Sequence, residues 1–408
     1  MMRNIILKNI DEIETCYYSK FQTHLDKIKR EGRYRKFVEI ERDASRFPIA
    51  FCPQIGCEVT LWCSNDYLGL GTNTEVIKQA SQVLQKCGIG AGGTRNISGN
   101  NSALVKLEQT LAKLHNRQQA LVFTSGYVAN QNAIFALSKI LHNLIIFSDS
   151  QNHASIIAGI SYAKVEKHIF AHNDLTSLEQ ALQQVDINAN KLIIFESVYS
   201  MDGSVAPIAQ ITQLARKYNA LTYVDEVHAV GLYGEKGAGL IEQLGLNEQI
   251  DIIQATLGKS FGGMGGYIAA KHEIIEAIRL VSPGFIFTTA IPPALAAGLD
   301  ASVNISMQSQ ELRKTHQAKV KLLKDSLCHA NIKFMQNDSH IIPVIIGDPI
   351  AAMQISQKLL HEYKIYVQHI NYPTVAKGTE RLRVIVTPYH SDEMIENFTW
   401  ALKHVLYN

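Results

Sequence analysis

The sequence lacks several features that would place it in a specialised class of protein. Its six cysteines form no Cys-x-x-Cys pair, which argues against a zinc finger or ribbon and suits a reducing compartment. Glycine and proline number only 26 and 10 among 408 residues, so the composition is neither fibrous nor disordered. The net charge of +2 creates no field that would attract nucleic acid or an anionic membrane. We therefore expect a globular protein with no metal site, no nucleic-acid partner and no membrane partner.

Targeting segments are also missing from the visible pattern. The first residues turn acidic after apolar stretches too short for a signal peptide, and they are not rich in arginine and serine as transit peptides are. One uncharged run, residues 280–299, is about as long as a membrane span. Pro283, Pro292 and Pro293 interrupt it, so we expect a buried loop and the start of a helix. These patterns predict a cytoplasmic protein.

Hydrophobic periodicity divides the chain into three parts. In residues 5–36 apolar side chains recur every three or four positions, which predicts an amphipathic helical arm packed on something larger. From Ala120 onward, short β-branched runs such as LIIFSD and KLIIFES alternate with helix-length stretches, which predicts a mostly parallel, seven-stranded sheet with helices on both faces. One long helical stretch over 293–330 leads to a smaller α/β domain. We expect units at 1–60, 61–295 and 296–408.

Three polar residues follow predicted strands in the central unit. Asp225 and His228 end the run LTYVDEVH, and Lys259 follows the run DIIQAT. Ligands of parallel sheets lie beyond the carboxyl ends of strands, so these groups can face one crevice. A lone lysine is more often a solvated surface residue. The occurrence of all three residues after predicted strands nevertheless favours a ligand-binding or catalytic site.

Pyridoxal phosphate (PLP) requires four groups from a protein, and the sequence offers a candidate for each. Lys259 can form the covalent link to the aldehyde, and Asp225 can pair with the pyridine nitrogen. His153 can stack on the ring, and the turn 124–127 before a predicted helix can bind phosphate through backbone amides. Thr256 and Ser260 can add hydroxyl groups. These residues predict PLP as the cofactor.

The same segments resemble a known family. The runs SDSQNHAS (148–155), ESVYSMDG (196–203), DEVHAVG (225–231) and Gly258-Lys259 are similar to the α-oxoamine synthases, fold-type I PLP enzymes that join an amino acid to an acyl-CoA with decarboxylation. The runs GRYR (32–35), WCSNDYLG (62–69), GGTRNISG (92–99), NYPT (371–374) and GTERLR (378–383) resemble the 5-aminolevulinate synthase branch in particular. The resemblance extends from about residue 31 to the C-terminus. It implies condensation of glycine with succinyl-CoA, the first step of tetrapyrrole biosynthesis.

The resemblance also implies a role for each matching residue. Lys259 links to the cofactor and removes the α-proton of glycine, while Asp225, His153 and His228 contact the cofactor ring. The remaining expected cofactor contacts within one chain are Ser125, Gly126, Tyr127, Ser200 and Thr256. The resemblance also implies a homodimer with active sites at the subunit interface. In that dimer Thr288 and Thr289 reach the cofactor phosphate of the neighbouring subunit. The expected substrate contacts are Arg383 and Asn65 for the glycine carboxylate, Arg35, Thr94, Asn96, Ile97, Ser148 and Thr374 for the succinyl group, and Lys167 near the CoA thioester.

Three alternatives stay open at the level of sequence. A sister enzyme would use another amino acid or acyl chain, although a long aliphatic or acetyl tail would leave the Arg35 guanidinium without a partner. A non-catalytic partner subunit would have lost the cofactor, and a generic aminotransferase would release a keto acid. One departure concerns a presumed mobile lid, where Ala376 and Lys377 replace the proline and arginine of many relatives. We expect this exchange to affect lid closure rather than chemistry.

Overall fold

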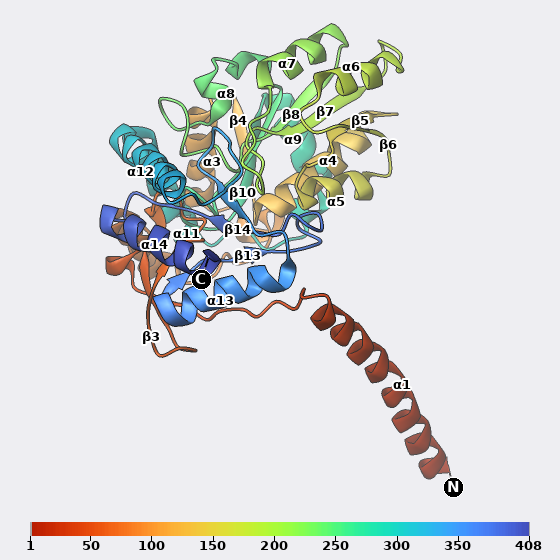
Figure 1. The fold of residues 1–408 in the computed structure, drawn as a ribbon. Coiled ribbons are helices and arrows are strands. Elements are labelled where there is room, and N and C mark those ends of the chain that lie inside the picture. Colours follow the sequence, from red (N-terminus) through yellow and green to blue (C-terminus); the bar gives the residue numbers. More distant parts are fainter. Residues whose placement is uncertain (1, 408) are drawn as a thin grey trace.

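A seven-stranded sheet forms the centre of the computed structural model, which describes the backbone of residues 2–407 and the side chains of residues 15–407 (Figure 1). The strand order is β4-β10-β9-β8-β7-β5-β6, and only β10 is antiparallel to its neighbours. The strands are β4 (Gln119–Phe123), β5 (Ile145–Asp149), β6 (Glu166–Phe170), β7 (Lys191–Glu196), β8 (Leu221–Asp225), β9 (Ile252–Thr256) and β10 (Gly266–Ala270). The predicted mostly parallel sheet is confirmed.

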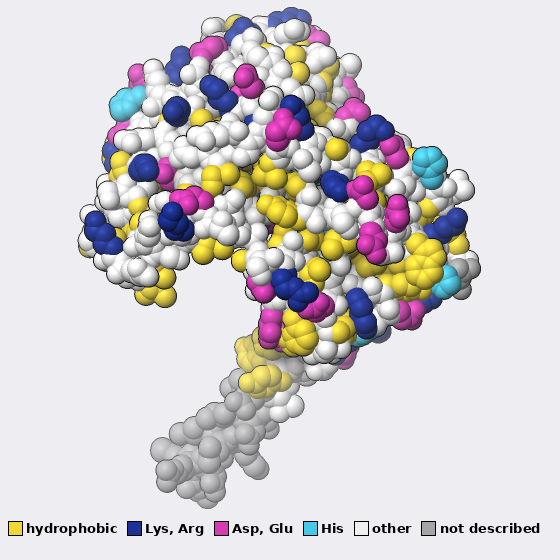
Figure 2. All heavy atoms as spheres, turned by 90° about the vertical axis from the view of Figure 1, so that its left-hand side faces the viewer, with side chains coloured by type: hydrophobic (Ala, Val, Ile, Leu, Met, Phe, Trp, Pro, Cys, Tyr) yellow, Lys and Arg dark blue, Asp and Glu magenta, His cyan; other side chains and the backbone are white. Residues whose placement is uncertain are grey.

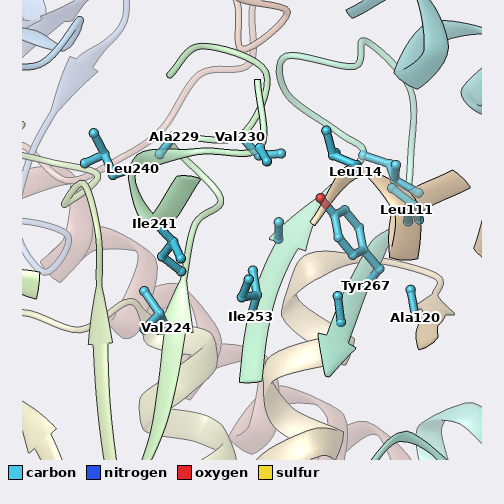
Figure 3. Close-up of a cluster of buried hydrophobic side chains, with 14 of the residues drawn as sticks. Leu111, Leu114, Ala120, Val224, Ala229, Val230, Leu240, Ile241, Ile253 and Tyr267 are labelled. Carbon is cyan, nitrogen blue, oxygen red and sulfur yellow. The ribbon is translucent and has the colours of Figure 1, made fainter. Parts of the chain in front are cut away.

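Successive side chains of the central strands enter two separate cores, one on each face of the sheet. Ile194 and Tyr223 belong to one core, whereas their neighbours Ile193 and Val224 belong to the other. Figure 3 shows part of the second core, where Val224 of β8 lies near Ile241. The first core is covered by α4 (Gly126–Ile140), α5 (Ala154–Ala163), α9 (His272–Val281) and α10 (Pro283–Ile286), and the second by α3 (Ser102–Leu114), α6 (Leu175–Gln183), α7 (Ile208–Lys217), α8 (Leu240–Gln243) and α11 (Pro293–Gln308). Continuous apolar strands therefore do indicate a sheet buried on both faces.

Strand β6 was not among the strand-forming runs that the sequence pattern indicated. Its sequence is EKHIF, and four of its five side chains are at least partly exposed. It lies at the edge of the sheet, beside β5 only. Charged side chains are common on edge strands, because they discourage pairing with other chains. The apolar signal of a buried strand is consequently absent here.

The C-terminal part contains a three-stranded sheet in the order β11-β14-β13, covered by helices. Its elements are α12 (Gln310–His329), β11 (Ile342–Ile345), α13 (Pro349–Tyr363), β13 (His369–Ile370), β14 (Arg381–Val384) and α14 (Asp392–Tyr407). The single helix predicted over 293–330 is wrong, because Ser309 has non-helical angles (φ −99°, ψ 62°) and separates α11 from α12. Residues 365–370 form two short strands, β12 (Ile365–Tyr366) and β13, which join different sheets.

The N-terminal part shares a sheet with the C-terminal part. Strands β1 (Glu41–Arg42), β2 (Ile49–Cys52) and β3 (Cys57–Leu61) are antiparallel, and β12 pairs with β3 in parallel. Trp62 packs in the core of the C-terminal part. The remaining short elements are η1 (Ala44–Arg46), η2 (Leu70–Thr72), α2 (Thr74–Cys87), η3 (Arg95–Gly99) and η4 (Asn247–Gln249). The units 1–60, 61–295 and 296–408 stay a prediction.

Helix α1 (Met2–Arg30) projects away from the body of the molecule (Figure 1). It ends earlier than the predicted residue 36, because Gly32 turns the chain with φ +64° and the Arg33 amide bonds the Ile28 carbonyl. Tyr17, Phe21 and Leu25 are exposed, so this apolar face of the helix does not pack on the rest of the chain. The predicted face residues Ile10 and Ile13 lie outside the described side chains.

No helix in the described part of the chain is both long and apolar enough to span a bilayer. The uncharged run 280–299 contains the end of α9, the short α10 and the start of α11, as its prolines indicated. On the face shown in Figure 2, basic and acidic side chains are interspersed rather than separated by sign.

Candidate active site

Strands β7, β8 and β9 end at one edge of the sheet and set the floor of the site. In the strand register Glu196 lies beside Asp225, and Asp225 lies beside Gln254. The segments that follow these strands contain Ser200, His228 and Lys259. The topology therefore brings together groups that are distant in sequence, as expected beyond the carboxyl ends of parallel strands.

Lys259 and His228 form the centre of this arrangement. The Lys259 Nζ atom lies 2.9 Å from His228 Nε2, and His228 Nδ1 lies 2.9 Å from the Tyr67 hydroxyl. Burial, followed by the charge of Arg383, lowers the pKa of Lys259 from 10.5 to about 7. Burial and the Lys259 charge also lower the pKa of His228 well below its ordinary value. The imidazole is thus neutral, and the lysine is available as a free amine near neutral pH.

Arg383 of β14 joins the site from the C-terminal part of the chain. Its Nε atom donates to the Ser200 carbonyl (2.8 Å), Nη1 to Asn65 Oδ1 (3.3 Å) and Nη2 to the Tyr67 hydroxyl (3.1 Å). Arg383 as a whole is 8% exposed, yet no carboxylate among the described residues forms a salt bridge with it. A buried cation without an acidic partner is suited to binding the carboxylate of a ligand.

Tyr67 is a site residue that sequence reasoning missed. It lies in the loop between β3 and α2, and its side chain is fully buried. Close backbone contact holds this loop against the Lys259 turn, because a Cβ atom on Gly262 would lie 2.0 Å from the Gly71 nitrogen. The run WCSNDYLG includes Tyr67, but only the structure shows that its hydroxyl connects His228 with Arg383.

Asp225 is buried at the end of β8 and is held by two donors. Asn130 Nδ2 donates to its Oδ2 atom (2.9 Å), and the Val227 amide donates to its Oδ1 atom (2.9 Å). Burial raises the pKa of Asp225, and the Asn130 hydrogen bond opposes this effect. Asn130 was not predicted, although it lies one helical turn after Gly126 on the α4 face that meets the sheet. These contacts fix the carboxylate in orientation.

His153 lies at the N-terminus of α5 with its side chain open to solvent. Its Nδ1 atom is 2.7 Å from Ser155 Oγ, and that hydroxyl also accepts a hydrogen bond from Asn130. The same asparagine therefore bonds Asp225 and the serine that holds His153. An exposed ring fixed beside a buried carboxylate matches what stacking on a flat heteroaromatic ring requires.

The N-terminus of α4 forms the third side of the site. Ser125 caps the helix by accepting the Val128 amide (3.1 Å), while Tyr127 is half-exposed. A Cβ atom on Gly126 would lie 3.4 Å from Thr256 Oγ1, so the turn lies against the end of β9. Free amides at a helix N-terminus favour phosphate. Together with the amine, the buried carboxylate and the open ring, this donor set fits PLP.

Two residues predicted to bind the succinyl group lie together although they are far apart in sequence. The Arg35 Nη2 atom donates to Thr374 Oγ1 (2.9 Å), and both residues are exposed. Asn371 supports the arrangement, because its side chain bonds the Gly32 carbonyl (3.1 Å). The N-terminal segment and the C-terminal loop therefore meet at a cation that faces solvent.

The other residues predicted to bind the succinyl group or the thioester form no hydrogen bond with this pair among the described residues. Among the described residues, no hydrogen bond connects Thr94, Asn96 or Ile97 with Arg35; Thr94 instead forms an isolated β-bridge with Thr289, next to Thr288. Ser148 is buried in β5, where it accepts a hydrogen bond from Asn152 (2.8 Å), and Lys167 is exposed on the edge strand β6. Their predicted roles would require bound substrate and a second copy of the chain.

Comparison with known proteins agrees with this geometry. The family model "Aminotransferase class I and II" matches residues 58–402. The chain is 53% identical to 5-aminolevulinate synthase of Rickettsia bellii over 389 residues, which cover 95% of this chain and 94% of that protein. It is 48% identical to 5-aminolevulinate synthase of Bradyrhizobium diazoefficiens over 391 residues, which cover 95% and 96%.

Solved structures show the same fold. Serine palmitoyltransferase from S. paucimobilis, with PLP and myriocin bound, superposes with a TM-score of 0.88 at 27% identity and covers 96% of this chain and 97% of its own. An 8-amino-7-oxononanoate synthase from Francisella tularensis gives a TM-score of 0.72 at 24% identity and covers 85% and 98%. The family resemblance stated from the sequence is confirmed, and the chain belongs to the class I and II aminotransferases and, within them, to the 5-aminolevulinate synthases.

Proposed function

We propose that the residues of this site divide the work of the 5-aminolevulinate synthase reaction among them, and that a second copy of the chain completes each site. The chain catalyses the decarboxylative condensation of glycine with succinyl-CoA, which yields 5-aminolevulinate, CoA and CO2. The observation that carries the assignment of roles is the hydrogen-bonded series Arg383–Tyr67–His228–Lys259, which sets a carboxylate-binding cation beside a reactive amine. When bound, PLP supplies an electron sink that stabilises negative charge at the glycine α-carbon.

Lys259 holds the cofactor and moves the α-proton of glycine. With a pKa near 7, its amine is largely neutral at neutral pH, which is the form that attacks an aldehyde or accepts a proton. His228 lies within hydrogen-bond distance of the amine and is itself held by Tyr67. The imidazole therefore directs Nζ without adding a second positive charge, and it can bond the phenolic oxygen of the cofactor.

The other cofactor groups act through position and charge. Asp225 pairs with the pyridine nitrogen and keeps positive charge there, because Asn130 fixes the orientation of the carboxylate. His153 stacks on the ring with its open face. The phosphate is received by the Ser125–Gly126–Tyr127 turn and Thr256, and Ser200 provides a further polar group.

Arg383 and Asn65 bind the glycine carboxylate. A guanidinium presents two parallel N–H donors that match the two oxygens of a carboxylate. This planar pairing fixes the orientation of glycine, and with it the C–H bond that is broken at the α-carbon. The Tyr67 hydroxyl holds Nη2 on the side facing His228. Because the hydrogen-bonded series from Arg383 ends at Lys259, glycine bound in this way would present its α-carbon to that amine.

Arg35 and Thr374 bind the distal carboxylate of the succinyl group. Their hydrogen bond shows that the two side chains already converge. A carboxylate at this position gains a charge-assisted contact that an acetyl or alkyl tail does not provide. Thr94, Asn96, Ile97 and Ser148 contribute to the same pocket, and Lys167 lies near the thioester.

A homodimer would explain why Thr94, Asn96 and Ile97 form no hydrogen bond with Arg35 among the described residues of one chain. The loops that contain Thr94 and Thr289 also expose large apolar side chains: Ile89 is 86% exposed, Ile97 72% and Phe287 80%. Exposed apolar groups gathered on neighbouring loops are typical of a protein interface. In the dimer, Thr288 and Thr289 contact the phosphate bound by the other copy.

Mixed dimers test this arrangement directly. We expect Lys259→Ala and the double variant Thr288→Val/Thr289→Val each to be nearly inactive alone. When the two are unfolded and refolded together, half of the dimers are hybrids, and each hybrid contains one intact site. The mixture should therefore recover about a quarter of wild-type activity. Formation of 5-aminolevulinate is measured, and activity no greater than that of the separate variants would rule out sites shared between copies.

A further inference from the structure

A buried histidine outside the predicted site contacts it through Tyr67. His340 lies in the loop before β11 and is 1% exposed. Its ring meets the Tyr67 ring edge-on, with centroids 4.6 Å apart and an interplanar angle of 65°. The hydroxyl of that tyrosine bonds both His228 and Arg383. A single side chain therefore separates His340 from two groups that contact the amine and the substrate.

The position of the His340 ring is fixed by its own hydrogen bonds. The Tyr233 hydroxyl accepts a hydrogen bond from the His340 backbone amide (3.2 Å) and lies 3.2 Å from its Nδ1 atom. The preceding Ser339 is bonded through its amide to Asn337, and Asn337 Nδ2 donates to the Asp202 carbonyl (2.9 Å). The loop is thus attached to the segment that follows β7, so the ring edge is held still against Tyr67.

The Tyr67 side chain requires a packed neighbour to keep its orientation. It belongs to a loop without regular structure, and its hydroxyl bonds a neutral imidazole and a guanidinium. Loss of the His340 ring would open space into which the Tyr67 phenol can rotate. Arg383 would then lose the hydroxyl that accepts its hydrogen bond. Burial, with the charges of His316, Arg383 and Lys259, lowers the pKa of His340 well below its ordinary value, so the ring adds no competing charge.

We infer that His340 is a positioning residue for glycine binding, which acts by holding the Tyr67 hydroxyl between Arg383 and His228. The inference rests on the proposed role of Arg383 in binding the glycine carboxylate. It requires the aromatic ring of His340 rather than its polarity. It also requires that the effect pass through the Tyr67 hydroxyl, since no described hydrogen bond joins His340 to either partner.

Two substitutions of His340 distinguish the effect of its aromatic ring from the effect of its polar atoms. His340→Gln keeps a polar group but no ring, and we expect it to raise the glycine dissociation constant about tenfold with a smaller effect on kcat. His340→Phe keeps the ring and should stay within about threefold of wild type. Glycine binding is followed by the change in visible absorbance of the loaded enzyme, and thermal unfolding of the cofactor-free chain reports stability separately.

A double-mutant cycle tests the route. In a Tyr67→Phe background, His340→Gln should add less than about threefold, because the hydroxyl it positions is already gone. His316→Leu is the matched control: His316 is buried and its ring lies 5.7 Å from that of His340, and in the described part of the chain it makes no ring contact with Tyr67. It should lower the unfolding temperature without coupling to Tyr67→Phe.

The outcomes distinguish the inference from the function on which it rests. Equal tenfold losses in both backgrounds, or equal behaviour of His340→Gln and His340→Phe, would overturn the positioning role. Arg383→Lys in the same titration must weaken glycine binding; if it does not, the proposed role of Arg383 fails instead. A change confined to unfolding temperature would show that His340 is only a packing residue.

Discussion

Replacing Lys259 with alanine is expected to abolish turnover. We expect the release of CoA from glycine and succinyl-CoA to fall by about 10⁴-fold, because the variant loses both the covalent attachment and the base that removes the α-proton. The fold should persist, and with it the proposed dimer, since only a flexible side chain is removed. CoA release is measured with a thiol reagent, and a small primary amine added to the solution should restore part of the rate. A variant within tenfold of wild type would contradict the assignment of Lys259.

The state of this amine can be measured without turnover. Because its neutral form reacts, capture of PLP by the cofactor-free wild-type chain should speed up as pH rises to about 7 and level off above that value. The sign follows from the lowered pKa, since burial and Arg383 disfavour the protonated amine. A lysine with an ordinary pKa of 10.5 would still gain reactivity at pH 9.

Replacing Asp225 with asparagine should have the second largest effect. The amide has nearly the same shape but no charge, so it cannot keep positive charge on the pyridine nitrogen, and we expect kcat to fall about a hundredfold. PLP should also dissociate more readily, which equilibrium dialysis measures.

The neighbouring Glu226 offers a matched control for this change. It is fully buried and accepts hydrogen bonds from Ser197, Leu240 and Ile241 rather than facing the site. Glu226→Gln should therefore reduce stability while leaving kcat and PLP affinity near wild type. If Asp225→Asn and Glu226→Gln lose activity alike, the special role of Asp225 is refuted. The loss would then be explained by replacement of any buried carboxylate.

The central sheet was predictable because buried parallel strands have a strong local signal. The run KLIIFE is apolar at its four central positions, and β7 is indeed buried at every position. The edge strand β6 lacks that signal, since its neighbours bury only one side of it. The break at Ser309 was also invisible, because serine is compatible with a helix and neither glycine nor proline marks the interruption.

The site was predictable where residues follow strands and unpredictable where they arrive from elsewhere. Lys259, Asp225 and His228 follow strands, so topology alone brings them to one edge. Tyr67, Asn130 and His340 reach the same centre from a loop, a helix and the C-terminal part of the chain. Their contacts depend on side-chain direction and on packing between distant segments, and neither is visible in a local pattern. Conversely, the sequence resemblance grouped Thr94 with Arg35, and this grouping stays a prediction, because no hydrogen bond joins them among the described residues.

The most direct test of the account compares acyl donors on the wild-type enzyme and on Arg35→Leu. With glycine present, succinyl-CoA should release CoA and CO2 in equal amounts from the wild type, whereas acetyl-CoA and octanoyl-CoA should release little. Arg35→Leu should lose about tenfold or more in kcat/KM for succinyl-CoA alone, because the lost contact is to a charged group. Equal use of acetyl-CoA by the wild type, or unchanged use of succinyl-CoA by Arg35→Leu, would contradict the proposed recognition of the succinyl carboxylate.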